Sequence, residues 1–323
     1  MARPQLLVAA VLLAIALAGC GGGGGGGGRG SLPVVDLALD FTPNAVHAPI
    51  YAAVRRGFDR AGGIALRIRQ PGEGPDALKL VASGRVAIGV LDIGDLALAR
   101  RRGIDIVAVG ELVNRPLAAL VAQPQIARPR DLEGRTIGVS GLPSDPAFVR
   151  AIIAHDGGDA RKLREVTIGF AAVSALLTRR VAAVPAFWNA EGVALKRRGL
   201  AVREFRIDDY GAPAYPEVVL VTARSTLRAH RDRVRASVRA IARGIDEVRA
   251  HPAAAVREIA AVAQTDDRGL IRAQLDAVAP LFAPGMRMDR TTIRRWADFE
   301  LRIGLIDRRP QVGRGFDFAL AGE

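Results

Sequence analysis

Residues 34–69 decide the fold, and they read VVDLALDFTPNAVHAPIYAAVRRGFDRAGGIALRIR. The apolar run Pro33–Phe41 is typical of a buried strand, and Pro49–Arg60 carries apolar residues at helical spacing. A second short strand, Ile64–Arg69, follows. A strand, a helix and a strand in this order predict parallel strands covered by helices.

The same alternation continues along the chain. In the first part we expect helices at Asp76–Ser83 and Ile93–Arg102 and strands at Val86–Val90 and Ile106–Leu112. In the second part we expect strands at Thr136–Val139, Ala182–Phe187 and Val202–Ile207 and helices at Asp145–His155 and Ala171–Arg179. Leu117–Ala122 and Val218–Thr222 are expected to cross between the parts, and the helix-rich tail from Ser225 to pack on the first.

A chain of 323 residues exceeds the size at which single cores stop growing, about 250 to 300 residues. We therefore predict an α/β protein of two separately cored lobes, each a mainly parallel sheet flanked by helices, with a hinge between them. Lobe 1 is expected to comprise residues 32–117 and 223–323, and lobe 2 residues 118–222.

The amino terminus has the layout of a secretory signal. Residues 1–19 carry one early charge at Arg3, then the apolar run Leu6–Ala18, which is too short to span a bilayer comfortably. The sequence Leu-Ala-Gly-Cys ends at Cys20 and resembles the bacterial lipobox, in which the cysteine becomes the lipidated first residue. An unpaired thiol is the alternative for this lone cysteine.

Residues 20–31 would then be a lipidated cysteine and a glycine-rich tether, because the run of eight glycines after Cys20 has no side chains to bury. The chain is accordingly expected to be exported and anchored to the membrane on its outer side. Although the formal net charge is +13, the basic residues are scattered near the ends of predicted helices, so nucleic-acid binding is not expected.

Small molecules bind beyond the carboxyl ends of strands in open α/β sheets. The first strand is followed by Phe41, Asn44 and His47, which offer an aromatic face, an amide and an imidazole in one loop. Asn44 could instead cap the next helix. Asp92 follows the third strand, where it could contact a ligand or cap a helix, and Ser140 follows the first strand of the second lobe.

The segment from Phe187 to Gly192 joins one of two tryptophans, Trp188, to Asn189 and Glu191 after a predicted strand. Such a cluster suits a flat, hydrogen-bonding ring, although Trp188 could equally belong to the core. Tyr215 lies on a later loop rich in proline and glycine, where it could line the cleft.

DFTPNAVHAPIYAA at residues 40–53, VASGRVAIGVLD at residues 81–92 and FWNAEG at residues 187–192 resemble motifs of the thiamine-pyrimidine-synthase-like periplasmic binding proteins of importers. The resemblance covers about Val34–Val221. It implies a two-lobed, hinged fold of the type II periplasmic binding class and a ligand such as formylaminopyrimidine or hydroxymethylpyrimidine, with riboflavin or another nitrogenous compound as the alternative.

The resemblance also implies roles for individual residues. Asn44 and Glu191 would hydrogen-bond the ring nitrogens and amino groups, while Phe41, Trp188 and Tyr215 would stack on the ring. His47 would lie at the edge of the cleft.

The synthase branch of that family uses a pyridoxal phosphate lysine and a sacrificial histidine in a stretch that here reads GVLDIGD. Leu91 and Asp95 stand at the lysine and histidine positions, and the family's cysteine-rich iron motif is missing. We therefore expect no enzyme, no catalytic residue, no cofactor and no metal.

The function expected from these observations is the lipoprotein substrate-binding component of an ABC importer, a monomer that clamps on a heteroaromatic ligand and delivers it to a permease and its ATPase. The rivals are an enzyme using His47 with Asp40 or Glu191 as acid and base, and a sensory binding module without transport.

Overall fold

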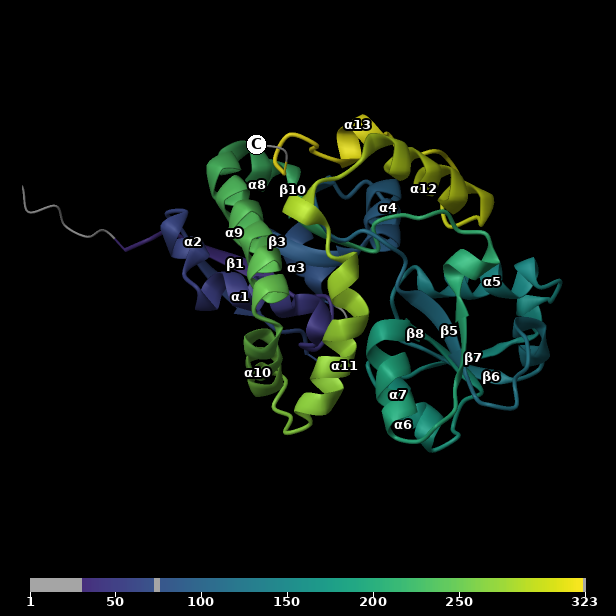
Figure 1. Ribbon diagram of the computed structural model, residues 1–323. Coiled ribbons are helices and arrows are strands. Elements are labelled where there is room, and N and C mark those ends of the chain that lie inside the picture. The colour runs from purple at the N-terminus through teal and green to yellow at the C-terminus, as the bar shows by residue number, and fades with distance from the viewer. Residues whose placement is uncertain (1–30, 73–75, 322–323) are drawn as a thin grey trace, which may run out of the picture. The chain divides into compact units, whose positions relative to one another are not determined.

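The computed structural model describes residues 31–72 and 76–321. The predicted signal peptide 1–19, the predicted lipidation site Cys20 and the predicted tether up to Gly30 lie outside the described residues. Leu32–Glu323 packs as one compact unit. It contains two five-stranded sheets (Figure 1). We call the first sheet with its flanking helices the first half, and the second sheet with its flanking helices the second half.

The first sheet has the strand order β2-β1-β3-β10-β4. Its strands are β1 (Val34–Ala38), β2 (Ala65–Arg69), β3 (Ile88–Asp92), β4 (Ile106–Val113) and β10 (Val218–Ala223). Its helices from the first part of the chain are α1 (Ala48–Arg55), α2 (Phe58–Ala61), α3 (Ala77–Ala82) and α4 (Ile93–Arg101). The predicted helix Pro49–Arg60 is thus two helices, because Gly57 adopts a left-handed φ of 69° between them.

The second sheet has the order β7-β6-β8-β5-β9. Its strands are β5 (Ala118–Ala122), β6 (Thr136–Val139), β7 (Arg164–Thr167), β8 (Ala183–Phe187) and β9 (Arg203–Arg206). Its helices are α5 (Asp145–His155), α6 (Ala172–Leu177) and α7 (Val193–Arg197). The edge strand β7 has no counterpart in the sequence prediction, because all four of its residues are exposed and it lacks an apolar run.

The predicted α/β fold with helix-flanked sheets is confirmed, but both sheets are mixed. β1 pairs in parallel with β2 and β3, whereas β10 runs antiparallel between β3 and β4. In the second sheet β5 is the antiparallel strand, between β8 and β9. β5 is the first strand after the chain crosses into the second half, and β10 is the first strand after it crosses back. Each therefore runs opposite to its neighbours in the sheet that it joins. The division into domains at residues 117 and 222 stays a prediction, while β10 as a whole belongs to the first sheet.

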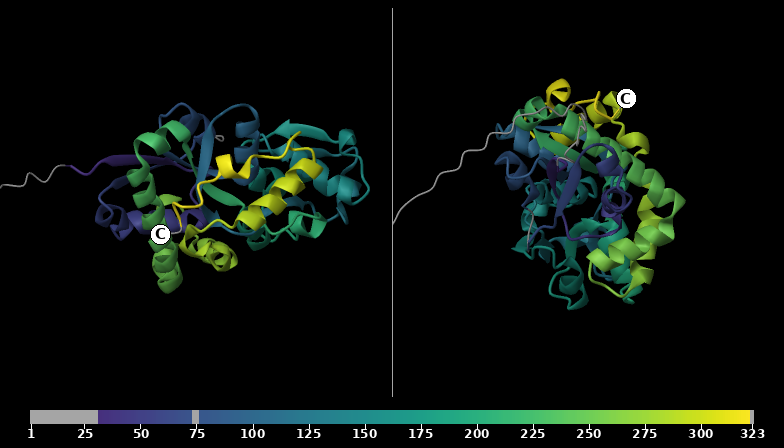
Figure 2. Two further views of the ribbon diagram at one scale, coloured as in Figure 1. Left: turned by 90° about the horizontal axis from the view of Figure 1, so that it is seen from above. Right: turned by 90° about the vertical axis from the view of Figure 1, so that its left-hand side faces the viewer.

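The tail forms α8 (Arg224–Ala229), α9 (Arg231–Ala250), α10 (Pro252–Val262), α11 (Arg268–Val278), α12 (Arg290–Arg302) and α13 (Val312–Gly315). α9 packs closely on α1, since a Cβ at Gly244 would lie 2.0 Å from the carbonyl oxygen of Pro49. The tail also contacts the second half: Gln274 in α11 donates to the carbonyl of Ala190 over 3.1 Å, and α12, yellow in Figures 1 and 2, donates from Arg302 to the carbonyl of Gly211 over 2.8 Å.

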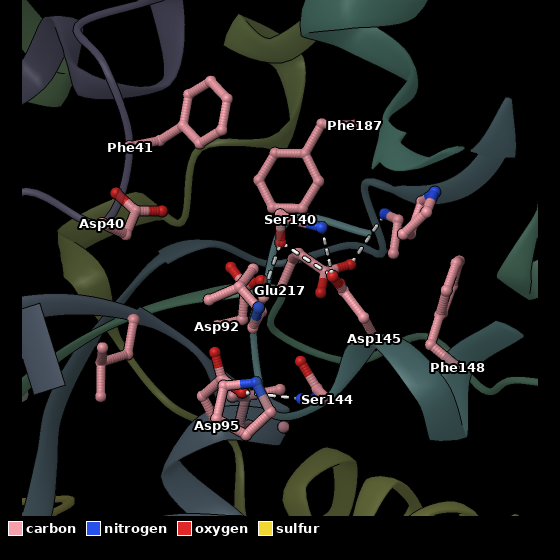
Figure 3. Close-up of a pocket in the computed structure, with 18 of the residues that line it drawn as sticks. Asp40, Phe41, Asp92, Asp95, Ser140, Ser144, Asp145, Phe148, Phe187 and Glu217 are labelled. Carbon is pink, nitrogen blue, oxygen red and sulfur yellow. Dashed lines mark hydrogen bonds between the residues drawn. The ribbon is translucent and has the colours of Figure 1, made fainter. Parts of the chain in front are cut away.

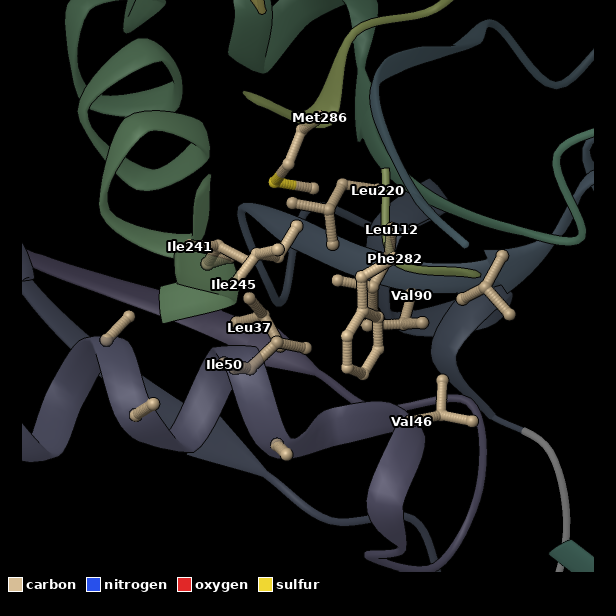
Figure 4. Packing of buried hydrophobic residues seen from close by; sticks show 14 of the residues in the cluster. Leu37, Val46, Ile50, Val90, Leu112, Leu220, Ile241, Ile245, Phe282 and Met286 are labelled. Atoms are coloured by element: carbon tan, nitrogen blue, oxygen red, sulfur yellow. The ribbon is translucent and has the colours of Figure 1, made fainter. Parts of the chain in front are cut away.

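The apolar core explains why the halves hold together. In the first half Leu37, Ile50, Leu220, Ile241 and Phe282 pack between the sheet and its helices (Figure 4). A second cluster runs through both sheets, including Val81 and Leu96 of the first half and Ile137 and Ile152 of the second. One apolar cluster thus continues from one half into the other, and the division of the chain into two separately cored lobes stays a prediction.

Candidate functional site

A cavity of about 410 Å³ lies between the two halves, at the carboxyl ends of their parallel strands. The first half contributes the residues after β1 and β3, and the second half contributes those after β6, β7 and β8. A cleft of this volume falls within the range of small-molecule sites, and the ends of parallel strands are where α/β folds place them. Seven of the nine predicted ligand residues line it, namely Phe41, Asn44, His47, Asp92, Ser140, Glu191 and Tyr215.

The loop after β1 is held by its own polar side chains. Asn44 Oδ1 accepts from the backbone N–H of Val46 over 2.9 Å, so Asn44 does cap the helical turn that follows. His47 Nδ1 accepts from the backbone N–H of Asn44 over 3.2 Å, and its Nε2 lies 2.8 Å from Asp40 Oδ1. These bonds fix the loop, which presents the ring of Phe41 to the cavity.

Asp92 ends β3 and makes no side-chain capping bond to α4. It is half-buried, and among the described residues its carboxyl has no hydrogen-bond partner. One turn further on, Asp95 Oδ1 accepts from the backbone N–H of Ser144 over 3.1 Å. Because Ser144 precedes α5, this bond joins the two halves beside the cavity.

In the second half, the loop after β6 folds around Asp145. Asp145 Oδ2 accepts from both the backbone N–H and the hydroxyl of Ser140, each over 2.8 Å. The hydroxyl of Ser140 in turn accepts from the backbone N–H of Leu142 over 3.2 Å. Ser140 lines the cavity with its hydroxyl already engaged.

The segment after β8 divides between cavity and core. Glu191 lines the cavity and accepts from the backbone N–H of Phe187 over 3.1 Å. Trp188 does not line it: its Nε1 donates to the carbonyl of Pro116 over 3.2 Å, and the Arg206 guanidinium stacks on its ring at 4.0 Å. Asn189 is fully buried away from the cavity, and neither of its amide atoms has a hydrogen-bond partner within the described part of the chain.

Tyr215 is a buried wall residue. Its ring stacks on Phe299 with 6.3 Å between centroids, and its hydroxyl donates to Glu217 Oε2 over 3.4 Å. The same oxygen accepts from the backbone N–H groups of Leu117 and Ala118, over 2.7 and 3.0 Å. Glu217 therefore ties together the two points at which the chain crosses between halves.

Sequence reasoning missed the aromatic partners of Phe41. Phe170, after β7, lies 4.2 Å from Phe41 between ring centroids and comes from the opposite half. Phe187 also lines the cavity (Figure 3). Phe187 stands at the end of a predicted strand and could have been found, whereas Phe170 follows the strand that the sequence did not reveal.

The cavity is rich in carboxyl groups, and several gather beneath the rings of Phe41 and Phe187 (Figure 3). Burial raises the pKa of Asp145 to about 6, of Asp95, Glu191 and Glu217 to about 7, and of Glu300 to about 8. Burial, followed by the nearby charge of Glu217, holds the pKa of Asp92 well above its usual value. These shifts mean that uncompensated negative charge is unfavourable in the cavity.

A family model described as "NMT1/THI5 like" matches residues 44–255. The chain belongs to this family. The formylaminopyrimidine-binding protein of Halalkalibacterium halodurans is 31% identical over 195 residues, 59% of each chain, so the match spans less than two thirds of that relative.

Other relatives carry other names. The riboflavin-binding protein RibY of Chloroflexus aurantiacus is 27% identical over 69% of this chain and 64% of its own length. The 4-amino-5-hydroxymethyl-2-methylpyrimidine phosphate synthase of Aspergillus parasiticus is 24% identical over 66% of each chain.

The fold of this NMT1/THI5-like chain is that of the periplasmic binding proteins. A Candida albicans gene product with the generic periplasmic binding protein fold superposes with a TM-score of 0.70 at 18% identity, covering 89% of this chain and 97% of that one. Across residues 31–72 and 76–321, none of the helices has the length and hydropathy of a transmembrane span. In the same residues no three His, Cys, Asp or Glu side chains are placed to hold a metal ion.

Proposed function

We propose that this chain is the substrate-binding component of an ABC importer and that its ligand is a small heteroaromatic compound, a pyrimidine precursor of thiamine such as formylaminopyrimidine or hydroxymethylpyrimidine. The observation that carries the proposal is the cavity between the halves, which combines aromatic rings from both halves with the carboxyl of Glu191. Stacking faces with a few fixed polar groups suit a flat, hydrogen-bonding ring. The named function of the Halalkalibacterium halodurans relative supports the same ligand class.

Capture rather than catalysis is the proposed role. The ligand would be held between Phe41 and Phe187, with Glu191 accepting from an exocyclic amino group, and Trp188 and Asn189 would support the wall rather than touch it. Two lobes would close on the ligand by bending at the crossings near Ala118 and Glu217, and the closed form would be the one that the permease and its ATPase recognise. No cofactor is part of this proposal.

Riboflavin is the second candidate ligand, because a riboflavin-binding relative matches 69% of this chain. A thermal-shift panel separates the two. At a concentration 100 times its Kd a ligand stabilises the folded state by about 2.7 kcal/mol. We expect 4-amino-5-hydroxymethyl-2-methylpyrimidine or its formylaminomethyl analogue to raise the unfolding midpoint and riboflavin to leave it unchanged.

A shift with riboflavin alone would favour the second candidate, and no shift with any of the three would contradict the proposal. Mass spectrometry of the same mixtures after incubation tests the absence of catalysis, because conversion of either pyrimidine by the purified chain would contradict a pure binding role.

Export and lipidation at Cys20 complete the proposal, with a monomer tethered outside the membrane by residues 20–31. Mass spectrometry of the mature amino terminus is expected to show a diacylglyceryl cysteine at Cys20. The Cys20→Ala variant is expected to lose that modification, and an unmodified Cys20 in the native protein would contradict the anchor.

A further inference from the structure

Most of the ionisable side chains that line the cavity are acidic. Seven carboxyl groups line it, those of Asp40, Asp92, Asp95, Asp145, Glu191, Glu217 and Glu300. Three basic side chains also line it, but Lys79 and Arg102 are exposed at its rim, and the imidazole of His47 is bonded to Asp40. Among the residues that the structure describes, the interior therefore holds no cation free to pair with the remaining carboxyls.

Most of these carboxyls are already satisfied by the protein. Asp95, Asp145, Glu191 and Glu217 accept from backbone N–H groups at 2.7 to 3.1 Å. Two are not. Asp92 has no hydrogen-bond partner among the described residues, and Glu300, only 4% exposed, has an Oε2 without one. Trp296 Nε1, which also completes no hydrogen bond among the described residues, lies near enough to Glu300 to lower the pKa of its carboxyl, so Asp92 is the carboxyl that most lacks a donor.

Buried acceptors without donors are costly, and a ligand that supplies donors recovers that cost. The groups that act electrostatically on Asp92 are Glu217, Asp95, Asp40 and Asp145, all of them acidic. A positive charge placed beside Asp92 would be attracted by each of them that is ionised, whereas a negative charge would be repelled.

Resting on the proposed function, we infer that this cavity selects a ligand that is positively charged when bound, through a protonated ring nitrogen or an amine, with Asp92 as its counter-charge. An aminopyrimidine can arrive protonated, or it can take its proton from a buried carboxyl that becomes a carboxylate. The same lining rejects an anionic ligand of equal size and shape.

Matched pyrimidines test charge at constant shape. The reference is 4-amino-5-hydroxymethyl-2-methylpyrimidine, whose ring is basic. In one analogue an oxo group replaces the 4-amino group, so the ring is no longer basic. The second analogue carries a carboxylate at position 5. By isothermal titration at pH 7 we expect each analogue to bind at least about tenfold more weakly than the reference, because the oxo analogue supplies no positive charge and the carboxylate analogue places a negative charge among buried carboxyls.

The variants tie the preference to the cavity. In Asp92→Asn the Kd of the oxo analogue is expected to exceed the Kd of the reference by about threefold or less. Asp276→Asn, an exposed carboxyl on α11 outside the cavity, is the matched control and should keep the wild-type ratio. Glu300→Gln is the second cavity variant should Asp92→Asn fail to fold.

The outcomes separate the two proposals. If the three pyrimidines bind within threefold of one another, the charge preference is overturned while the proposed function stands. If the cavity variants keep the wild-type ratio, Asp92 and Glu300 are not the counter-charge and the inference is again overturned. If none of the pyrimidines binds, the proposed function and this inference fall together.

Discussion

The carboxylate of Asp95 and the backbone N–H of Ser144 form a 3.1 Å hydrogen bond that joins α4 of the first half to the start of α5 in the second. Beside it, Leu98, Ala147 and Leu305 form a small apolar cluster that draws on both halves. These contacts close one side of the cavity, so any opening movement there must break them.

Asp95→Ala removes this link and is expected to speed ligand release about two- to tenfold, the range that a net hydrogen-bond contribution of about 0.5 to 1.5 kcal/mol gives. Stopped-flow displacement of bound pyrimidine measures the release rate. Asp95→Asn is the control, since its side-chain oxygen can still accept from Ser144. Equal release rates for the Asn and Ala variants would mean that the bond does not hold the cavity closed.

The raised carboxyl pKa values predict how the ligand-free protein responds to pH. Between pH 5 and pH 8 the folded state holds more protons than the unfolded chain on Asp95, Glu191, Glu217 and Glu300, so raising the pH lowers the free energy of unfolding. Carboxyls with a lowered pKa, such as Asp159 at about 2, change their protonation below pH 5 and so do not alter this trend.

We expect the unfolding midpoint to fall by several degrees from pH 5 to pH 8, at about 2 to 4 °C per kcal/mol. Differential scanning fluorimetry measures this. The fall should be smaller in Glu300→Gln, which removes one of the titrating groups, and a midpoint that rises over this range would refute the explanation.

Phe41→Ala tests the aromatic wall. The ring contacts Phe170 across the cavity, and an aromatic stacking partner contributes about 0.5 to 1.5 kcal/mol beyond the buried area, so we expect the Kd for a pyrimidine to rise about tenfold or more. Phe58→Ala, whose ring lies outside the cavity beneath Arg243, is the matched control.

Trp188→Ala distinguishes the ring predicted from sequence from the rings that line the cavity. Its packing against Pro116 and Arg206 predicts a lower unfolding midpoint, with a smaller loss of affinity than in Phe41→Ala. If titration of both folded variants showed the larger loss of affinity in Trp188→Ala, Trp188 would be a ligand-contacting residue.

Glu217→Ala tests the tie between the crossings. Loss of its carboxylate leaves the N–H groups of Leu117 and Ala118 without an acceptor, at a cost of about 1 to 3 kcal/mol for a buried unsatisfied group. Urea unfolding should show this loss in Glu217→Ala and a smaller one in Glu217→Gln, which keeps an acceptor oxygen. Equal stability of all three proteins would contradict the structural role of Glu217.

The sequence was a good guide wherever apolar periodicity was strong. Helix α5 (Asp145–His155) and strand β6 (Thr136–Val139) have the predicted bounds, and the ends of β1, β3, β6 and β8 supplied six of the seven predicted residues that line the cavity. β7 was missed because an exposed edge strand has no apolar signal.

Orientation within the site was beyond sequence reasoning. Trp188 and Glu191 stand three residues apart in a π-helical turn, where one side chain faces the core and the other the cavity. Glu300 is remote from every predicted motif and reaches the cavity only through the placement of α12, whereas Glu217 stands two residues after the predicted Tyr215, at the start of β10, and was not singled out.

The most direct test of the central claim is calorimetric titration of 4-amino-5-hydroxymethyl-2-methylpyrimidine into the wild type, Glu191→Gln and the control Glu258→Gln, whose carboxyl lies on α10 beside Arg55. We predict one ligand per chain, a Kd about tenfold higher for Glu191→Gln, and wild-type affinity for Glu258→Gln. The same affinity in all three proteins, or no binding to the wild type, would contradict a ligand site between the halves.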